Sequence, residues 1–206
     1  MILISFEFIN WGGTKLTKFF ILFINTSSIQ TSMLDIDIRN ESTGDYNNIK
    51  EINNLAFNQE KEGELIENLR KKPEFISELS LVAVHDKKII GHILCFPVTI
   101  NSDKKSYTTL SLAPMAVLPS QQKKGVGGAL IKAVLDKAAK FGFTSVVVLG
   151  HPQYYPRFGF RKAVIWKLKE PFGVPEEVMM AIELKEGGLV STGGMIEFPE
   201  EYYTAM

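Results

Sequence analysis

Residues 112–133 read LAPMAVLPSQQKKGVGGALIKA, and this stretch decides the fold. It begins as an apolar strand that ends at Pro119, continues through a basic, glycine-rich turn, and ends as a helix of alanine and branched aliphatic residues. Gly125, Gly127 and Gly128 have no Cβ, so the backbone can turn sharply and a ligand can lie against it. The first N–H groups of a helix lack intrahelical partners and lie at its positive end. The stretch therefore predicts a binding site for a phosphate-like anion.

The composition is that of an ordinary globular protein. The chain has 206 residues, 45% of them hydrophobic and 22% charged, which is enough for one well-buried domain. Lys plus Arg equals Asp plus Glu, 23 each, so no overall field attracts nucleic acid or an anionic membrane, and any anion site must be local. Cys95, the one cysteine of the sequence, lies in the strand-like run HILCF. We therefore expect a buried thiol and a reducing, cytoplasmic compartment.

The first 32 residues differ in pattern from the rest of the chain. They contain an apolar segment, FFILFI at 19–24, which is far shorter than the roughly 18 to 20 residues that span a bilayer. No small-residue cleavage pattern follows this segment, so it is also a poor signal peptide. Met33 then opens a regular strand pattern. We predict an upstream extension over 1–32, poorly ordered or loosely packed, a natural start at Met33, and a single domain over 33–206.

Strand and helix patterns alternate along this domain. Period-2 alternation or runs of β-branched residues predict strands at 34–39, 80–86, 89–100, 107–119 and 145–150, with further strands near 163–169, 178–185 and 194–198. Helical spacing predicts helices at 45–57, 62–71 and 125–141. The two strands on either side of 86–88 should form a hairpin. The third helix should bury one apolar stripe against a sheet, made of Val126, Leu130, Val134, Ala138 and Phe141.

Three phosphate-binding signatures can be compared with the glycine turn. A P-loop needs G-x-x-x-x-G-K-[ST], and nothing after Gly125 matches it. A dinucleotide fingerprint, G-x-G-x-x-G, fails at its third glycine, where Leu130 stands. What remains is Q-x-x-G-x-G, formed by Gln122, Gly125 and Gly127 between a strand and a helix.

This turn and its surroundings resemble the GNAT family of acetyl-coenzyme A-dependent N-acetyltransferases. The resemblance rests on LAPMAVLPSQQKKGVGGAL at 112–130 followed by LGHPQYYPRFGF at 149–160. The pair is similar to a bacterial and archaeal branch of predicted N-acetyltransferases with an LGxPxYYxRFGF motif. The resemblance covers about residues 34 to 200. It implies an α/β fold with a central mixed sheet, splayed at its middle and flanked by helices. The pantetheine arm of acetyl-CoA would lie in the splay and the pyrophosphate on the glycine turn.

The resemblance also implies which residues bind acetyl-CoA. Backbone groups of Met115, Ala116 and Val117 would pair with the pantetheine amides. The pyrophosphate would contact N–H groups of the turn, those of Gln122, Lys123, Lys124, Gly125, Val126 and Gly127. Gly128 and Ala129 would open the helix. The side chain of Lys123 or Lys124 could meet a cofactor phosphate, or the two could form only a solvated basic pair.

Acetyl transfer to an amine needs an uncharged nucleophile, stabilisation of the oxyanion, and a proton for the leaving thiolate. The family often uses a tyrosine as the acid, and the Y-x-R-x-G-F pattern puts Tyr155 there, with Tyr154 as the fallback. Tyr155 could also be only a packed aromatic residue. A backbone N–H of Ala116 or Val117 would stabilise the oxyanion. The base is less defined, because the strand before the turn has no carboxylate. His151 follows a strand near the expected thioester and could serve, or could have only a hydrogen-bonding role.

We therefore predict an enzyme that moves acetyl from acetyl-CoA to a primary amine by direct transfer in a ternary complex. The missing strand carboxylate leaves open a non-catalytic module that binds acyl-CoA as a sensor or regulator. The acceptor would be a small-molecule or peptide amine, with no nucleic-acid or membrane partner, and the protein would be a monomer or homodimer. His85 and His92 read as ordinary strand residues, and with His151 they are too scattered to suggest a metal site.

Overall fold

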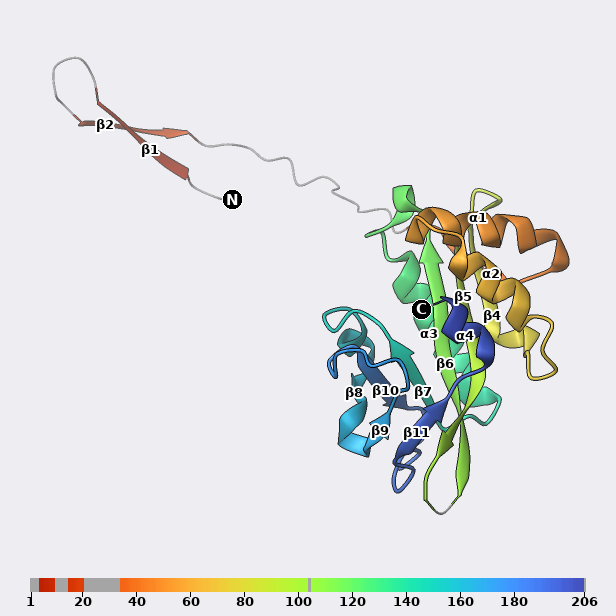
Figure 1. Cartoon of the computed structure of the whole chain (residues 1–206). Coiled ribbons are helices and arrows are strands. Elements are labelled where there is room, and N and C mark those ends of the chain that lie inside the picture. The colour runs from red at the N-terminus through yellow and green to blue at the C-terminus, as the bar shows by residue number, and fades with distance from the viewer. Residues whose placement is uncertain (1–3, 10–14, 21–33, 104, 206) are drawn as a thin grey trace. The chain divides into compact units, whose positions relative to one another are not determined.

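The computed structural model describes residues 4–9, 15–20, 34–103 and 105–205 (Figure 1). The chain divides into two units, Met1–Met33 and Leu34–Met206. In the first unit, β1 (Ile4–Ile9) and β2 (Lys15–Phe20) pair antiparallel. Met33, the expected start of the domain, lies outside the described residues, as does most of the apolar segment 19–24.

One open mixed sheet forms the centre of the second unit. Its strands follow the order β3-β4-β5-β6-β7-β10-β8. Their bounds are β3 Asp37–Asn40, β4 Ser80–His85, β5 Lys88–Asn101, β6 Ser106–Val117, β7 Ser145–Leu149, β8 Arg161–Lys162 and β10 Met179–Glu183. Neighbours pair antiparallel except β6 and β7, which are parallel. Off this path, β11 (Gly194–Glu197) pairs with the C-terminal end of β5 and with β9 (Leu168–Lys169).

Helices cover both faces of this sheet (Figure 1). One face carries α1 (Tyr46–Phe57), α2 (Lys61–Leu69) and the C-terminal α4 (Glu200–Ala205), and we call it the α4 face. The other carries α3 (Val126–Lys140), and we call it the α3 face. Side chains alternate along β5 accordingly, Phe96 toward the α4 face and Cys95 toward the α3 face. The core therefore consists of two apolar clusters separated by the sheet.

Most expected elements are present, with two corrections. The expected hairpin forms between β4 and β5, and its turn residues Asp86 and Lys87 have φ of 48° and 62°. The strand predicted near 163–169 is wrong, because Ala163–Trp166 forms a 3-10 turn between two short strands. Phe141 was expected in the buried stripe of the third helix and is 50% exposed, because α3 already ends at Lys140.

The sheet opens between its two parallel strands. β6 and β7 pair only at Leu110–Val146 and Ser111–Val147, although β6 continues to Val117. The register between β5 and β6 shifts beside this point, and such an irregularity increases local twist. We call the region beyond the Ser111–Val147 pair the β6–β7 divergence. The mixed sheet flanked by helices that the resemblance implies is confirmed, and its strands separate at a defined residue pair.

Candidate active site

The end of β6 directs backbone groups toward the divergence. The N–H of Leu118 donates to a β5 carbonyl at 2.9 Å. Backbone groups alternate sides along a strand, so Ala116 also faces β5, whereas Met115 and Val117 face the β7 side. There the Val117 carbonyl accepts a hydrogen bond from the Gln122 side-chain amide at 3.2 Å. Within the described parts of the chain, no residue of β7 pairs with Met115 or Val117 of β6. Met115 and Val117 are therefore placed to pair with an amide-bearing ligand.

The glycine turn brings unpaired N–H groups to the same end of β6. Gly125 precedes α3 with φ of 90°, a left-handed conformation that favours glycine. The first helical hydrogen bond runs from the N–H of Ala129 to the carbonyl of Gly125 at 3.0 Å. The N–H groups of Val126, Gly127 and Gly128 therefore have no intrahelical acceptor and lie at the positive end of the helix. This is an arrangement that binds phosphate.

The basic side chains of the turn are at the surface. Lys123 and Lys124 are both exposed, and Lys124 Nζ donates to Gln121 Oε1 at 3.1 Å. Lys123 has φ of 62°, so the turn depends on left-handed backbone at a non-glycine residue as well as at Gly125. The two lysines can move toward a bound anion, but the backbone defines where it would lie.

A side chain at Gly127 would run into groups from two other elements. A Cβ built there lies 2.5 Å from the hydroxyl of Tyr154, 3.6 Å from Met115 Cε and 3.7 Å from Val117 Cγ2. The guanidinium of Arg157 stacks on the Tyr154 ring at 3.9 Å from its centroid. The start of α3, the end of β6 and the 3-10 turn η4 (Tyr155–Phe158), with Tyr154 directly before it, therefore meet at one place.

Tyr155 lies deeper, on the α3 face of the sheet. It is 7% exposed, and its ring packs edge-on against Tyr154 and Phe160 at centroid distances of 5.3 Å and 5.5 Å. The ring occupies the space that a side chain at Gly150 would need. Burial raises the pKa of Tyr155, and Tyr154 and Cys95 add to the rise. A phenol that stays protonated suits the predicted role as an acid.

The other predicted residues have contrasting environments. His151 is exposed, two residues after β7, and its backbone carbonyl accepts a hydrogen bond from the N–H of Tyr154 at 2.9 Å. Cys95 is fully buried, and burial raises the pKa of its thiol, which confirms the expected core cysteine. In the described ranges, no three His, Cys, Asp or Glu side chains gather closely enough to hold a metal ion. No helix within those ranges is long and apolar enough to cross a membrane.

A buried polar cluster behind β6 was not predicted. Glu41 accepts hydrogen bonds from Arg70 Nε at 2.8 Å and Nη2 at 2.7 Å, and the two side chains are 2% and 8% exposed. His92 Nε2 lies 3.0 Å from Ser80 Oγ and 3.5 Å from Glu41 Oε2. Burial alone would raise the pKa of Glu41, but its hydrogen-bonding neighbours, first His92 and then Arg70, lower it to about 2. Because His92 pairs with Ala116, the cluster supports the strand that faces the divergence.

No sequence pattern could have revealed this cluster. Its members come from the end of β3, the end of α2, the start of β4 and the middle of β5. The prediction that His92 is an ordinary strand residue missed its contact with a carboxylate. The one available signal was a histidine in an otherwise apolar strand run, GHILCF.

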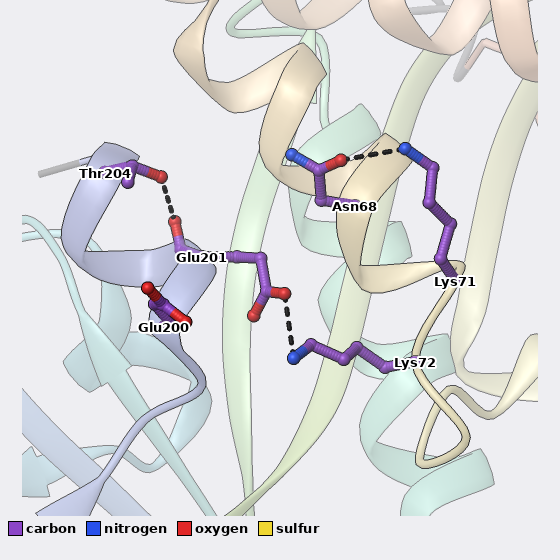
Figure 2. A pocket seen from close by; sticks show the side chains of 6 residues that line it. All are labelled: Asn68, Lys71, Lys72, Glu200, Glu201 and Thr204. Atoms are coloured by element: carbon purple, nitrogen blue, oxygen red, sulfur yellow. Dashed lines mark hydrogen bonds and ion pairs between the residues drawn. The ribbon is translucent and has the colours of Figure 1, made fainter.

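A shallow polar pocket of about 370 Å³ lies elsewhere, between the end of α2 and α4 (Figure 2). It is lined by Asn68, Lys71, Lys72, Glu200, Glu201 and Thr204. Lys72 Nζ forms an ion pair with Glu201 Oε1 at 2.9 Å, and Lys71 donates to Asn68 Oδ1 at 2.9 Å. None of these residues belongs to β6, the glycine turn or η4, so the pocket is separate from the predicted cofactor site.

The fold and site together define a class of protein. Diverging strands with free backbone groups, next to a helix start that attracts phosphate, suit an enzyme whose ligand carries both amides and phosphates. A family model described as an acetyltransferase (GNAT) domain matches residues 37–163. The chain therefore belongs to the GNAT acetyltransferase family, and the resemblance found in the sequence is confirmed. The narrower branch, with its LGxPxYYxRFGF motif, stays a prediction.

Individual relatives agree with this assignment. The chain is 37% identical over 134 residues to the uncharacterized N-acetyltransferase YjhQ of Escherichia coli K12, covering 65% of this chain and 74% of YjhQ. The crystal structure of YhbS from Escherichia coli in complex with CoA has a TM-score of 0.77 and 28% identity, over 82% of this chain and 93% of YhbS. A GNAT acetyltransferase of Brucella melitensis in complex with acetyl-CoA has a TM-score of 0.66 and 28% identity, over 82% and 99% of the two chains.

Proposed function

We propose that the protein moves an acetyl group from acetyl-CoA to a primary amine, by direct transfer in a ternary complex. One observation carries this proposal: the free backbone of β6 beyond Ser111 lies next to the unpaired N–H groups at the start of α3. CoA has an amide-bearing arm and a pyrophosphate, which match these two features in the same order. Membership of the GNAT family and the CoA and acetyl-CoA complexes of two relatives support the same ligand.

In this proposal β6 and the turn hold acetyl-CoA. Met115 and Val117 pair with the pantetheine amides, and Ala116 keeps the strand in place through β5. The pyrophosphate lies on the turn from Gln122 to Gly127, with the helix opening at 128–129 behind it.

Two side chains carry the protons. Tyr155 donates to the leaving thiolate, since it is buried, protonated and part of the same apolar cluster as the β6–β7 pair Leu110 and Val146. His151 is the proposed acceptor of the proton from the amine, because its exposed imidazole lies two residues after β7. With the amine uncharged, its lone pair attacks the thioester carbon, and the carbonyl oxygen becomes an oxyanion. When the carbonyl forms again, the C–S bond breaks and the sulfur takes the proton of Tyr155. The nitrogen then loses its extra proton to give the amide, and an equivalent proton returns to the Tyr155 phenolate.

The proposal extends to the acceptor, the oligomeric state and the location of the protein. The acceptor is a small-molecule or peptide amine, and the protein acts as a monomer or homodimer. We propose a cytoplasmic location, since the buried Cys95 has no partner in the sequence for a disulfide.

The test combines calorimetry with thiol release. Titration with CoA and acetyl-CoA measures binding, and a panel of polyamines, amino acids, aminoglycosides and peptides is then screened for release of free CoA. Release that requires an amine, with equal formation of acetylated amine and no acetyl-protein by mass spectrometry, supports direct transfer. Tight binding of acetyl-CoA without thiol release for any amine supports the sensor module instead and overturns the enzyme proposal.

A further inference from the structure

Tyr202, on α4, is a buried tyrosine whose hydroxyl lacks a hydrogen-bond partner in the part of the chain that the structure describes. The residue is 4% exposed, and its ring packs against Phe198 at a centroid distance of 5.2 Å. Burial raises the pKa of Tyr202, and the nearby Ser111 side chain opposes this in part without forming a hydrogen bond. Buried polar groups without partners are costly and rare in native structures, so this hydroxyl requires an explanation.

The position of the hydroxyl supplies one. Ser111 is the last β6 residue paired with β7, opposite Val147, and Val147 belongs to the same apolar cluster as Tyr202. The next residues of the two strands on this face, Ala113 and Leu149, pack against that cluster and are only partly buried. The phenol therefore lies at the apex of the β6–β7 divergence.

The C-terminal segment brings the phenol to this point. β11 pairs with β5, Phe198 follows it, and α4 then packs beside α2 on the α4 face (Figure 1). Tyr155 approaches from the α3 face, and Cys95 contributes to the raised pKa of both phenols. Two protonated hydroxyl groups thus flank the separating strands, one from each face of the sheet.

The apex is where the tip of an inserted ligand would lie. The glycine turn holds the phosphate end beside Val117, and Ser111 is about 20 Å further along β6 at the usual rise per residue. An arm anchored at the turn and lying along the free backbone therefore presents its terminal group, not its amides, to Tyr202. The terminal group of acetyl-CoA carries a carbonyl oxygen, which free CoA lacks.

We propose that the Tyr202 hydroxyl donates a hydrogen bond to the carbonyl oxygen of the acyl group in the β6–β7 divergence. This inference rests on the proposed function. It gives Tyr202 a role distinct from that of Tyr155, which faces the sulfur, and it makes the C-terminal segment part of the reaction centre.

The variant Tyr202→Phe tests this inference, because it removes the hydroxyl and keeps the ring. Calorimetry on the full chain measures Kd for acetyl-CoA and for CoA. Loss of one hydrogen bond should weaken acetyl-CoA binding about three- to tenfold, with CoA binding unchanged within about twofold. The melting temperature should stay equal or rise, because a buried hydroxyl without a partner has been removed.

Tyr203→Phe is the matched control, since Tyr203 is adjacent and 50% exposed and should change neither ligand. An equal loss for both ligands, or an unchanged ratio of the two Kd values, overturns the inference and leaves Tyr202 a packing residue. An unchanged ratio with weaker amine binding assigns the hydroxyl to the acceptor instead and also overturns it. A wild-type protein that binds neither ligand refutes the proposed function, which separates the two failures.

Discussion

Replacement of Glu41 by Gln should lower the free energy of unfolding by about 3 kcal/mol or somewhat more, because it leaves the Arg70 guanidinium buried without its carboxylate. The pair is 2% and 8% exposed and is joined by two charge-assisted hydrogen bonds of 2.8 Å and 2.7 Å. A second estimate comes from the pKa of Glu41, which falls from 4.5 to about 2. At about 1.4 kcal/mol per unit this shift also corresponds to about 3 kcal/mol.

The stabilisation by Glu41 should depend on pH, and the lowered pKa of Glu41 gives the direction of that dependence. The pKa of Glu41 is lower in the folded protein than in the unfolded chain, so its contribution is fully present above pH 4.5. The contribution is lost as the pH falls toward 2. The difference in stability between wild type and Glu41→Gln should therefore be largest near pH 7 and shrink below pH 4.5.

Urea unfolding of both proteins at several pH values measures this difference, with the slope m compared to confirm that the unfolded states are alike. Glu67→Gln is the matched control, because Glu67 pairs with Lys50 at 2.9 Å but the side chains are 41% and 36% exposed. An exposed pair of this kind is worth at most about 1 kcal/mol. A loss below about 1 kcal/mol for Glu41→Gln, or a difference that does not change with pH, would refute the reasoning.

The remaining predictions concern the site. Gly127→Leu should weaken CoA binding at least about tenfold in calorimetry, because the leucine side chain would meet the Tyr154 hydroxyl and the free end of β6. Gly44→Ala is the control, because a Cβ has room there. Equal affinity of both variants for CoA would disprove that the pyrophosphate lies on the glycine turn. Tyr155→Phe should lower kcat at least about tenfold with little change in the Kd of CoA, as for a group that acts in the transition state. An unchanged kcat removes Tyr155 as the acid. Cys95 should not react with an aromatic disulfide reagent until the protein unfolds, since its thiol is buried and its pKa raised; rapid labelling of the native protein would contradict this.

Some elements resisted prediction for a definable reason. The strand expected near 163–169 has a suitable apolar pattern, but β8 and β9 each pair for only two residues, with partners from later in the chain. A strand forms only where a neighbouring strand pairs with it, and the local sequence pattern does not show which residues that neighbour will pair with. The end of α3 could not be predicted from the local pattern either, since Phe141 continues the apolar spacing although the helix ends at Lys140.

The sequence by itself predicted the anion site and identified the family. The site depends on consecutive residues, from the strand through Gly125 to the start of a helix, and the backbone geometry of neighbouring residues is a local property. Only the tertiary structure decided which side chains from distant elements lie together around β6. Glu41 meets Arg70 and His92, and the Tyr202 hydroxyl reaches the apex of the divergence, through packing of elements far apart in the chain. Burial raises the pKa of Tyr202 and leaves its hydroxyl without a partner, whereas hydrogen-bonding neighbours lower the pKa of Glu41 against the effect of burial. Burial and these contacts are properties of the folded chain as a whole.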